Sequence, residues 1–267
     1  MVDALRAYGW IITMWVRSTM AYRASFLMLT FGQFFGTGLD FVTIFIMFVH
    51  TDELGGFTLP EVGFIYATSG VAIGMADLLL GSIERIGQRI RDGSVDVMLV
   101  RPVSAFVQAA ADRFALRRLG RILQSTAVLV WSLTVLDIHW TWDRVLLVPI
   151  MLICGTVIFC SVFVLGAAFQ FAASDAAQVA NAFTYGGNFL TQYPPTIFAK
   201  DLIKAATFAI PLAFVNWMPA LHILDRADPL GLPKAFQFAS PIAAAAITLV
   251  AGLAWRAGIR SYRSTGS

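Results

Sequence analysis

The most unusual residue in this sequence is Asp40, a carboxylate in the middle of the long apolar stretch 24–49. A charged side chain at the centre of a bilayer costs about 2.5–3.5 kcal/mol on insertion scales, so Asp40 should face protein or water and not lipid. At about 100° per residue, Asp40 shares one helical face with three other polar residues, Thr30, Gln33 and Thr37. We predict that these four side chains line a polar translocation pathway across a membrane.

A second polar face occurs between residues 176 and 193. Its members recur at helical spacing and are Asn181, Thr184, Tyr185, Asn188 and Gln192. For any single residue of this kind, hydrogen bonding between packed helices is a sufficient explanation. Two faces that each extend over several helical turns favour a pathway, so we predict that these five residues form its second wall.

No sequence pattern for catalysis or for metal binding is present. There is no Gly-x-x-x-x-Gly-Lys-Ser/Thr phosphate-binding loop, and neither His-Glu-x-x-His nor Gly-x-Ser-x-Gly occurs. The two cysteines, Cys154 and Cys160, lie in one apolar run, and the three histidines form no spaced ligand set. We therefore expect no catalytic residue, no metal site and no bound cofactor on this chain. If it belongs to an active pump, ATP and Mg²⁺ bind to a separate ATPase polypeptide.

The composition shows which elements must position these residues. Of the 267 residues, 58% are hydrophobic and only 13% are charged, with a mean hydropathy of +0.74. Soluble domains carry about 25% charged residues, so a soluble enzyme, a disordered chain and a coiled coil are excluded. The net charge of +3 is too small and too dispersed for a nucleic-acid partner. The apolar runs are continuous and not alternating, which predicts an all-α polytopic membrane protein in a lipid bilayer and not a β-barrel.

Five apolar stretches are near or above the length that crosses the hydrocarbon core, which takes about 20 helical residues. They are residues 24–49, 61–81, 119–136, 145–173 and 235–255. Arginine is abundant before the first stretch, in the loop after the second and after the last, whereas the loop 50–60 contains no Lys or Arg. By the positive-inside rule both termini are cytoplasmic, so the number of spans is even.

Two further stretches, 176–193 and 205–224, compete for the sixth span. The charge balance slightly favours 205–224, but Pro211 and Pro219 divide that stretch into short pieces. We predict six transmembrane helices, with 176–193 as the fifth and residues 194–234 as an outer re-entrant region.

The N-terminal segment, residues 1–23, is predicted to be an interfacial helix. It has apolar and aromatic residues at helical spacing, and its tryptophans Trp10 and Trp15 favour the headgroup region. No internal repeat and no linker divides the sequence. We therefore expect residues 1–267 to form a single transmembrane domain.

The cytoplasmic loop 82–118 begins with an amphipathic segment, residues 82–91. One face of this segment carries Ile83, Ile86 and Ile90, and the other faces carry Glu84, Arg85 and Arg89. A purely solvated loop gains nothing from an isoleucine face, so we predict that these six residues dock on a cytoplasmic protein. The alternative is a basic loop that only contacts anionic lipid.

A more specific pattern, Gly-x-x-Asp-x-x-Leu-x-Arg-Pro, follows this segment and is formed by Gly93, Asp96, Leu99, Arg101 and Pro102. A Tyr-Pro pair occurs later, at Tyr193 and Pro194, ahead of a proline-rich stretch. With these motifs the chain resembles the membrane subunits of type-2 ABC exporters. The resemblance covers essentially the whole chain, and it implies an interfacial helix, six spans, a re-entrant hairpin and cytoplasmic termini in a bacterial inner membrane.

The resemblance also implies a function and two protein partners. Members of this family export drug-like compounds, antibiotics, lipids or glycans, so the chain is expected to be the permease subunit of an exporter of an amphipathic or drug-like compound. It would pair with a second permease subunit, identical or paralogous, and the segment 82–91 would dock on a separate ATPase that binds ATP and Mg²⁺. Two other functions stay open. One is an ion- or proton-coupled transporter or channel that uses Asp40, and the other is a scaffold subunit without transport.

Overall fold

The structure is a computed structural model that describes residues 2–173 and 177–263. Within these two ranges, all regular secondary structure is helical apart from one β-bridge between Leu54 and Phe57. The α-helices are α1 (Val2–Met20), α2 (Arg23–Phe48), α3 (Leu59–Leu80), α4 (Ile86–Arg91), α5 (Ser94–Val100), α6 (Ala105–Ala111), α7 (Leu119–Val135), α8 (Trp142–Gln170), α9 (Ala177–Thr191), α10 (Lys200–Phe208), α11 (Trp217–Ile223) and α12 (Ser240–Ser261). Short 3₁₀ helices connect some of them: η1 (Gly81–Arg85), η2 (Leu116–Arg118), η3 (Pro195–Ile197), η4 (Leu212–Phe214) and η5 (Lys234–Phe238).

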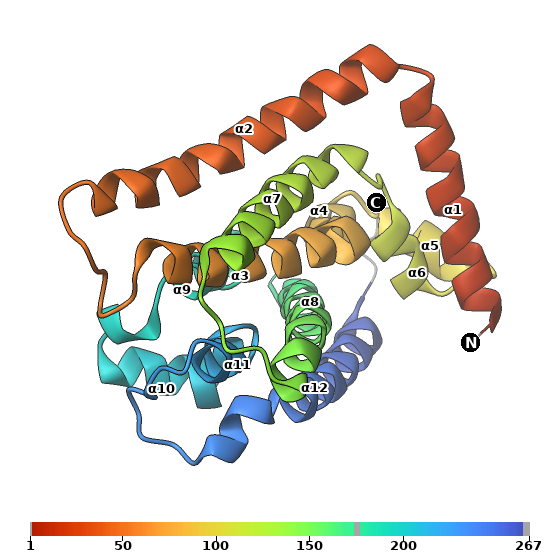
Figure 1. The fold of residues 1–267 in the computed structure, drawn as a ribbon. Coiled ribbons are helices and arrows are strands. Elements are labelled where there is room, and N and C mark those ends of the chain that lie inside the picture. The colour runs from red at the N-terminus through yellow and green to blue at the C-terminus, as the bar shows by residue number, and fades with distance from the viewer. Residues whose placement is uncertain (1, 174–176, 264–267) are drawn as a thin grey trace.

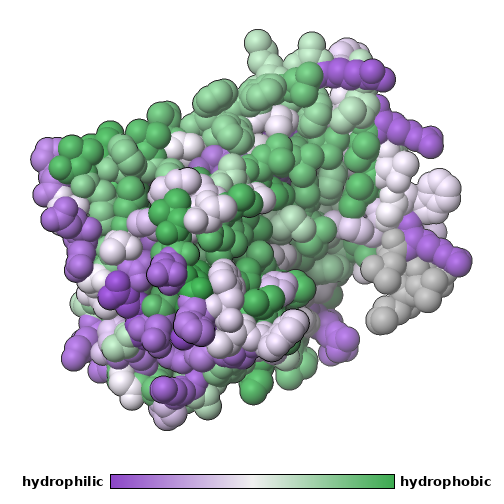
Figure 2. All heavy atoms as spheres, viewed as in Figure 1, coloured by the Kyte–Doolittle hydropathy of each residue, from purple (hydrophilic) through white to green (hydrophobic). Residues whose placement is uncertain are grey.

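Several of these helices have the length and composition to cross a membrane. Four continuous segments qualify: α2, α3 extended through η1 and α4, α8, and α12. The pair α10 and α11 makes a fifth candidate if it counts as one span, although the pair is bent by 80°. Hydrophobic side chains cover much of the middle of the molecule, and hydrophilic ones gather toward its ends (Figure 2). The prediction of an all-helical polytopic membrane protein is confirmed.

The central helix of the bundle is α3, which contacts α2, α7, α8 and α9 (Figure 1). In the most apolar stretch of the segment from α3 through α4, 72% of the residues are buried inside the protein. The corresponding share for α2 is 11%. The contact between α3 and α7 is close because α3 presents Gly63, Gly70 and Gly74 to it. A Cβ atom at these glycines would lie 2.8, 2.2 and 2.8 Å from α7 side chains. Small residues of this kind let two helices approach inside a membrane.

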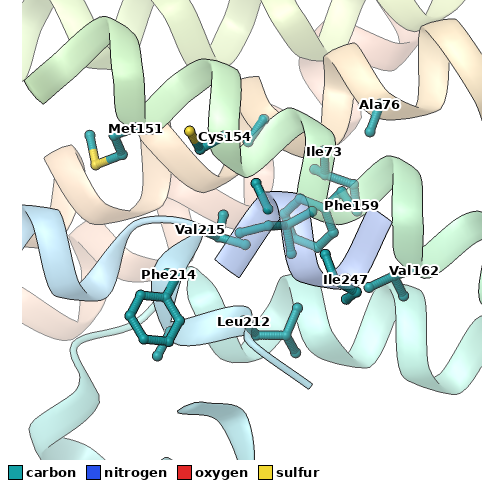
Figure 3. Close-up of a cluster of buried hydrophobic side chains, with 14 of the residues drawn as sticks. Ile73, Ala76, Met151, Cys154, Phe159, Val162, Leu212, Phe214, Val215 and Ile247 are labelled. Atoms are coloured by element: carbon teal, nitrogen blue, oxygen red, sulfur yellow. The ribbon is translucent and has the colours of Figure 1, made fainter. Parts of the chain in front are cut away.

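The hydrophobic core lies where α3, α8 and α12 meet the chain around η4 (Figure 3). Ile73 of α3, Phe159 of α8 and Val215 just after η4 are at most 1% exposed, and Ile247 of α12 packs with them. The carbonyl oxygen of Val215 comes so near to Gly155 that a Cβ there would lie 2.9 Å from it. Since Gly155 is near the middle of α8, the bend between α10 and α11 reaches deep into the bundle.

The segment from α10 to α11 begins and ends at the same end of the bundle. Just before α10, the hydroxyl of Thr196 donates a 2.6 Å hydrogen bond to the carbonyl of Gly55. Just after α11, Arg226 donates two 2.8 Å hydrogen bonds to the carboxylate of Glu61, and these bonds raise the pKa of Arg226 above its usual range. Gly55 and Glu61 flank the start of α3. The chain therefore descends from this end of the bundle to η4 and returns to it.

The N-terminal helix α1 lies at an angle to α2 and packs against α6 (Figure 1). The hydroxyl of Tyr8 donates a 2.5 Å hydrogen bond to the carbonyl of Leu79, at the end of α3. Trp10 and Met14 of α1 are exposed. A helix is thus present where the sequence predicts one, and its placement at a membrane surface stays a prediction.

Candidate functional site

The first predicted polar face lies on α2, and most of it is packed against other helices. Thr37 is buried, its hydroxyl donates to the carbonyl of Gln33 at 2.9 Å, and its own carbonyl accepts a 2.8 Å hydrogen bond from Tyr66 of α3. Thr30 and Gln33 are half-buried where α7 crosses α2 at Gly120. These three residues therefore contribute to helix packing.

Asp40, the fourth member of this face, is different because its side chain is exposed. It forms no hydrogen bond and no ion pair with any residue in the described ranges. On the same helix Gly32 and Gly36 are also exposed, and a Cβ atom at either would meet nothing within 4 Å. This side of α2 is therefore exposed at Gly32, Gly36 and Asp40.

The second predicted polar face lies on α9, and its later part is tied to α3. Ser69 of α3 forms hydrogen bonds with the side chains of Asn188, at 3.3 Å, and Thr191, at 2.6 Å. The amide group of Asn216 donates 2.8 Å hydrogen bonds to the carbonyls of Thr191 and of Ile65 in α3. These contacts join α9, the chain after η4 and α3 into one hydrogen-bonded unit.

The other residues predicted on this face differ in exposure. Two of them are buried, Thr184 and Gln192, and two are exposed, Asn181 and Tyr185. The hydroxyl of Tyr185 lies 3.4 Å from a carboxylate oxygen of Glu84, to which it donates. Residue 176, where the sequence places the start of this helix, lies outside the described residues.

The two polar faces meet at one level of α3. Tyr66 holds α2 there, and Ser69, three residues further on, holds α9. The sequence analysis missed Tyr66, Ser69 and Asn216, because the stretches that contain them are apolar on average. The only sequence signal is the spacing of Tyr66 and Ser69, which places two hydrogen-bonding side chains on adjacent faces of a buried helix.

The amphipathic segment 82–91 is helical, but its isoleucine face is not free. The exposed fractions of Ile83, Ile86 and Ile90 are 0%, 2% and 8%, and all three belong to the hydrophobic core of this chain. The backbone N–H of Gly87 donates a 2.8 Å hydrogen bond to the side chain of Gln170 at the end of α8. In this structure α8 and the neighbouring short helices cover the face, so it is not exposed to another protein. That the loop docks at all stays a prediction.

The charged residues predicted beside this face have separate surroundings. Arg85 is exposed, Glu84 is half-buried beside Tyr185, and Arg89 forms an ion pair with Asp112. Of these, only Arg85 is fully available to a partner.

The Gly-x-x-Asp-x-x-Leu-x-Arg-Pro motif forms α5 and the turn after it. Gly93 precedes α5 with φ +67°, a left-handed conformation that glycine adopts without strain, and Asp96 lies in the first turn. The exposed apolar and basic residues that follow form a surface that we name the α5 surface: Val97, Leu99, Val100, Arg101 and Pro102.

The Tyr-Pro motif ends α9. Pro194 is buried and follows the last turn, where a proline cannot continue the helix. The carbonyl of Tyr193 accepts a 3.0 Å hydrogen bond from the indole N–H of Trp217 in α11. The ring of Tyr193 packs on that of Phe189 with centroids 5.2 Å apart. The motif thus positions an aromatic pair where α9 meets the segment that leads to α10.

The polar groups of the bundle offer hydrogen bonds and charge, and the described ranges contain no group of three or more His, Cys, Asp or Glu side chains placed to hold a metal ion. His222 pairs with Asp143 at 2.6 Å where α11 meets the start of α8. This contact joins α8 and α11 on the side of the molecule away from α2 (Figure 1).

An all-helical bundle with several apolar spans, and with polar side chains gathered around its central helix, defines a polytopic membrane protein. The family model described as ABC-2 family transporter protein matches residues 34–266. The chain therefore belongs to the ABC-2 family of transporter proteins, which confirms the resemblance to type-2 ABC permeases. Comparison with curated proteins and with solved structures gave no match.

Proposed function

We propose that this protein is the permease subunit of an ATP-driven exporter, which moves an amphipathic or drug-like compound out across a bacterial inner membrane. Membership of the ABC-2 family supports a transport role in a membrane. The sequence has no phosphate-binding loop, so ATP and Mg²⁺ would bind to a separate ATPase subunit. The observation that carries the proposal is the α5 surface, which offers that ATPase a place to bind.

The α5 surface has the properties of a docking site. Val100 is 87% exposed and Val97 is 56% exposed, which is unusual for apolar side chains in a loop that would otherwise lie in water. The short helix beneath them is held firmly, because Gln108 donates hydrogen bonds of 2.9 and 2.7 Å to the carbonyls of Met98 and Val103. A fixed apolar projection beside Arg101 suits a groove on a partner protein, since such contacts bind with little loss of conformational entropy.

Replacing Val100 with aspartate should reduce recovery of the ATPase with tagged permease by at least about tenfold, because the carboxylate would have to be desolvated in the groove. The fold should be unaffected, since Val100 is exposed. The measurement is co-purification of the ATPase subunit with the tagged permease from detergent-solubilised membranes of the native host. Ala227→Asp, at an exposed position near the other end of the bundle, is the control. Normal recovery of the ATPase with Val100→Asp would contradict docking through the α5 surface.

For the topology, we propose six spans, α2, α3, α7, α8, α9 and α12, with α10 to α11 as a re-entrant segment and both termini in the cytoplasm. The tethers of Thr196 and Arg226 to the start of α3 support the re-entrant path. Phe106 of α6 packs on Trp255 of α12 with ring centroids 5.4 Å apart. The arginine-rich loop and the end of the last helix therefore lie together, as an even number of spans requires.

This orientation predicts which residues an impermeant thiol reagent reaches on intact cells. In a variant without Cys154 and Cys160, a cysteine in place of Ala227 should react on intact cells, whereas one in place of Arg101 should react only after the cells are permeabilised. Both positions are exposed, so burial does not limit the reaction. Labelling at position 101 on intact cells would reverse the orientation.

We further propose that two permease subunits, identical or paralogous, enclose a pathway between α2 and α9. The backbone carbonyl of Thr37 and the side chain of Asn188 keep these two helices in place through hydrogen bonds to α3. The exposed polar residues are Asp40, Asn181 and Tyr185, and in this arrangement they are the ones that face the transported compound.

A further inference from the structure

A groove lies on the side of the bundle away from α2, where α10, η4 and η5 meet α8 and α12 (Figure 1). Its volume is about 440 Å³, within the range of about 300–1,000 Å³ that is usual for sites that bind small organic molecules. The ring centroid of Phe236 lies 6.4 Å from those of Phe208 and Phe214, and these three rings form one side of the groove. Ala246 and Val250 of α12 line the other side. No described residue of α2 or α9 lines the groove, so it is separate from the proposed pathway.

The walls of this groove suit hydrocarbon. Among the described residues that line it, only Thr207 has a polar side chain, and its hydroxyl already donates a 2.7 Å hydrogen bond to the carbonyl of Ile203. A polar ligand would therefore lose its hydrogen bonds to water there and gain few in return. Two of the walls belong to α8 and α12, which have the composition of membrane spans, and Val250 in one of them is 54% exposed. The groove therefore opens toward lipid, whose acyl chains are the apolar molecules within its reach.

All three lysines of this sequence flank the part of the groove that is formed by α10 and η5. Lys204 precedes Phe208 by one turn on the same face of α10, and Lys200 lies one turn before Lys204. Lys234 precedes Phe236 by two residues in η5. Each of the three lysines is exposed. Lysine side chains in such places extend along apolar surface and hold their ammonium groups at the level of the lipid headgroups.

The ammonium groups of these lysines are available to an anion. Lys200 and Lys234 form no ion pair with a described residue. Lys204 pairs with Asp201 at 3.3 Å, but the side chain of Asp201 is 96% exposed, and a surface pair of this kind contributes little. Asp228, the nearest acid before Lys234 in the sequence, accepts hydrogen bonds of 3.1 and 2.7 Å from two backbone N–H groups of its own loop. Positive charge beside an apolar groove complements a molecule that has an anionic head and a hydrocarbon tail.

We propose that this groove holds an acyl chain of an anionic phospholipid, whose phosphate is bound by Lys204 and Lys234. The inference goes beyond the proposed export function, because the groove is not part of the pathway between α2 and α9. The bound lipid is a structural partner that holds α10 and η5 against α8 and α12.

The test is native mass spectrometry of the purified protein in detergent, titrated with dioleoylphosphatidylglycerol or with dioleoylphosphatidylcholine, which has the same chains and no net charge. The anionic lipid should bind more tightly. Lys204→Gln and Lys234→Gln should each weaken its binding about fivefold and leave that of the zwitterionic lipid unchanged. Ala246→Trp fills the groove and should weaken binding of both lipids at least about tenfold.

Two matched controls lie on α12. Ala245→Trp places the same ring at a neighbouring exposed position that does not line the groove, and Arg260→Gln removes one positive charge at the other end of the helix. Neither should change lipid binding. Equal affinity for the two lipids would overturn the proposal, as would equal losses for Ala245→Trp and Ala246→Trp. The lysine variants alter only exposed side chains, so they decide the question even if Ala246→Trp lowers the unfolding temperature. The assay involves neither the ATPase nor transport, so its failure would leave the proposed function intact.

Discussion

Ile86→Asp is expected to abolish the folded protein and not only its binding to an ATPase. Ile86 is 2% exposed and packs in the core that the short helices share with α8. The substitution loses roughly 2 kcal/mol of apolar burial. It also leaves a buried charge without a partner, which costs about 3–5 kcal/mol. The sum is a large fraction of the stability of a protein domain. We expect little monodisperse protein after solubilisation and a strongly lowered unfolding temperature.

Gln88→Asp is the matched control for this prediction. Gln88 is exposed on the same short helix, so an aspartate there stays in water and should change the unfolding temperature little. A normally folded Ile86→Asp variant that had lost its ATPase would restore the isoleucine face as the docking face. It would also show that the contact of this segment with α8 is absent from the assembled transporter.

Gly120→Ala should displace α2 from α7 and lower the stability of the protein. A Cβ atom at Gly120 would lie 2.2 Å from the carbonyl oxygen of Thr30 and 2.9 Å from the amide nitrogen of Phe34. Both are backbone atoms of α2, so no side-chain rotation relieves the clash and the helix itself has to move. Overpacking costs about 1–3 kcal/mol, and a clash with backbone belongs at the upper end of that range. The measurement is thermal unfolding in detergent.

Gly252→Ala provides the comparison, because this glycine is also within a helix but a Cβ there would meet nothing within 4 Å. It should be neutral or slightly stabilising, since alanine favours a helix by about 1 kcal/mol relative to glycine. Equal unfolding temperatures for the two variants would show that α2 does not pack on α7 as closely as the structure places it.

The segments that span the membrane were predictable from the sequence, because insertion depends on local composition. Charge-poor runs of sufficient length predicted α2, α3, α8 and α12, and the structure contains each of them. The family was also predicted from the sequence, and the family model that matches residues 34–266 confirms it. The break at Pro211 was predictable as well, since proline interrupts a helix wherever it stands.

The partner of each helix face was decided only by the tertiary structure. Periodicity shows that Ile83, Ile86 and Ile90 share a face, but an apolar face is equally well satisfied by another protein or by α8 of the same chain. The polar faces had the same ambiguity: the side chain of Asn188 bonds to α3 and Thr37 is buried, whereas Asp40 is exposed. The physical reason is that helical spacing fixes directions around one axis. Which neighbour stands in each direction depends on how all the helices pack together.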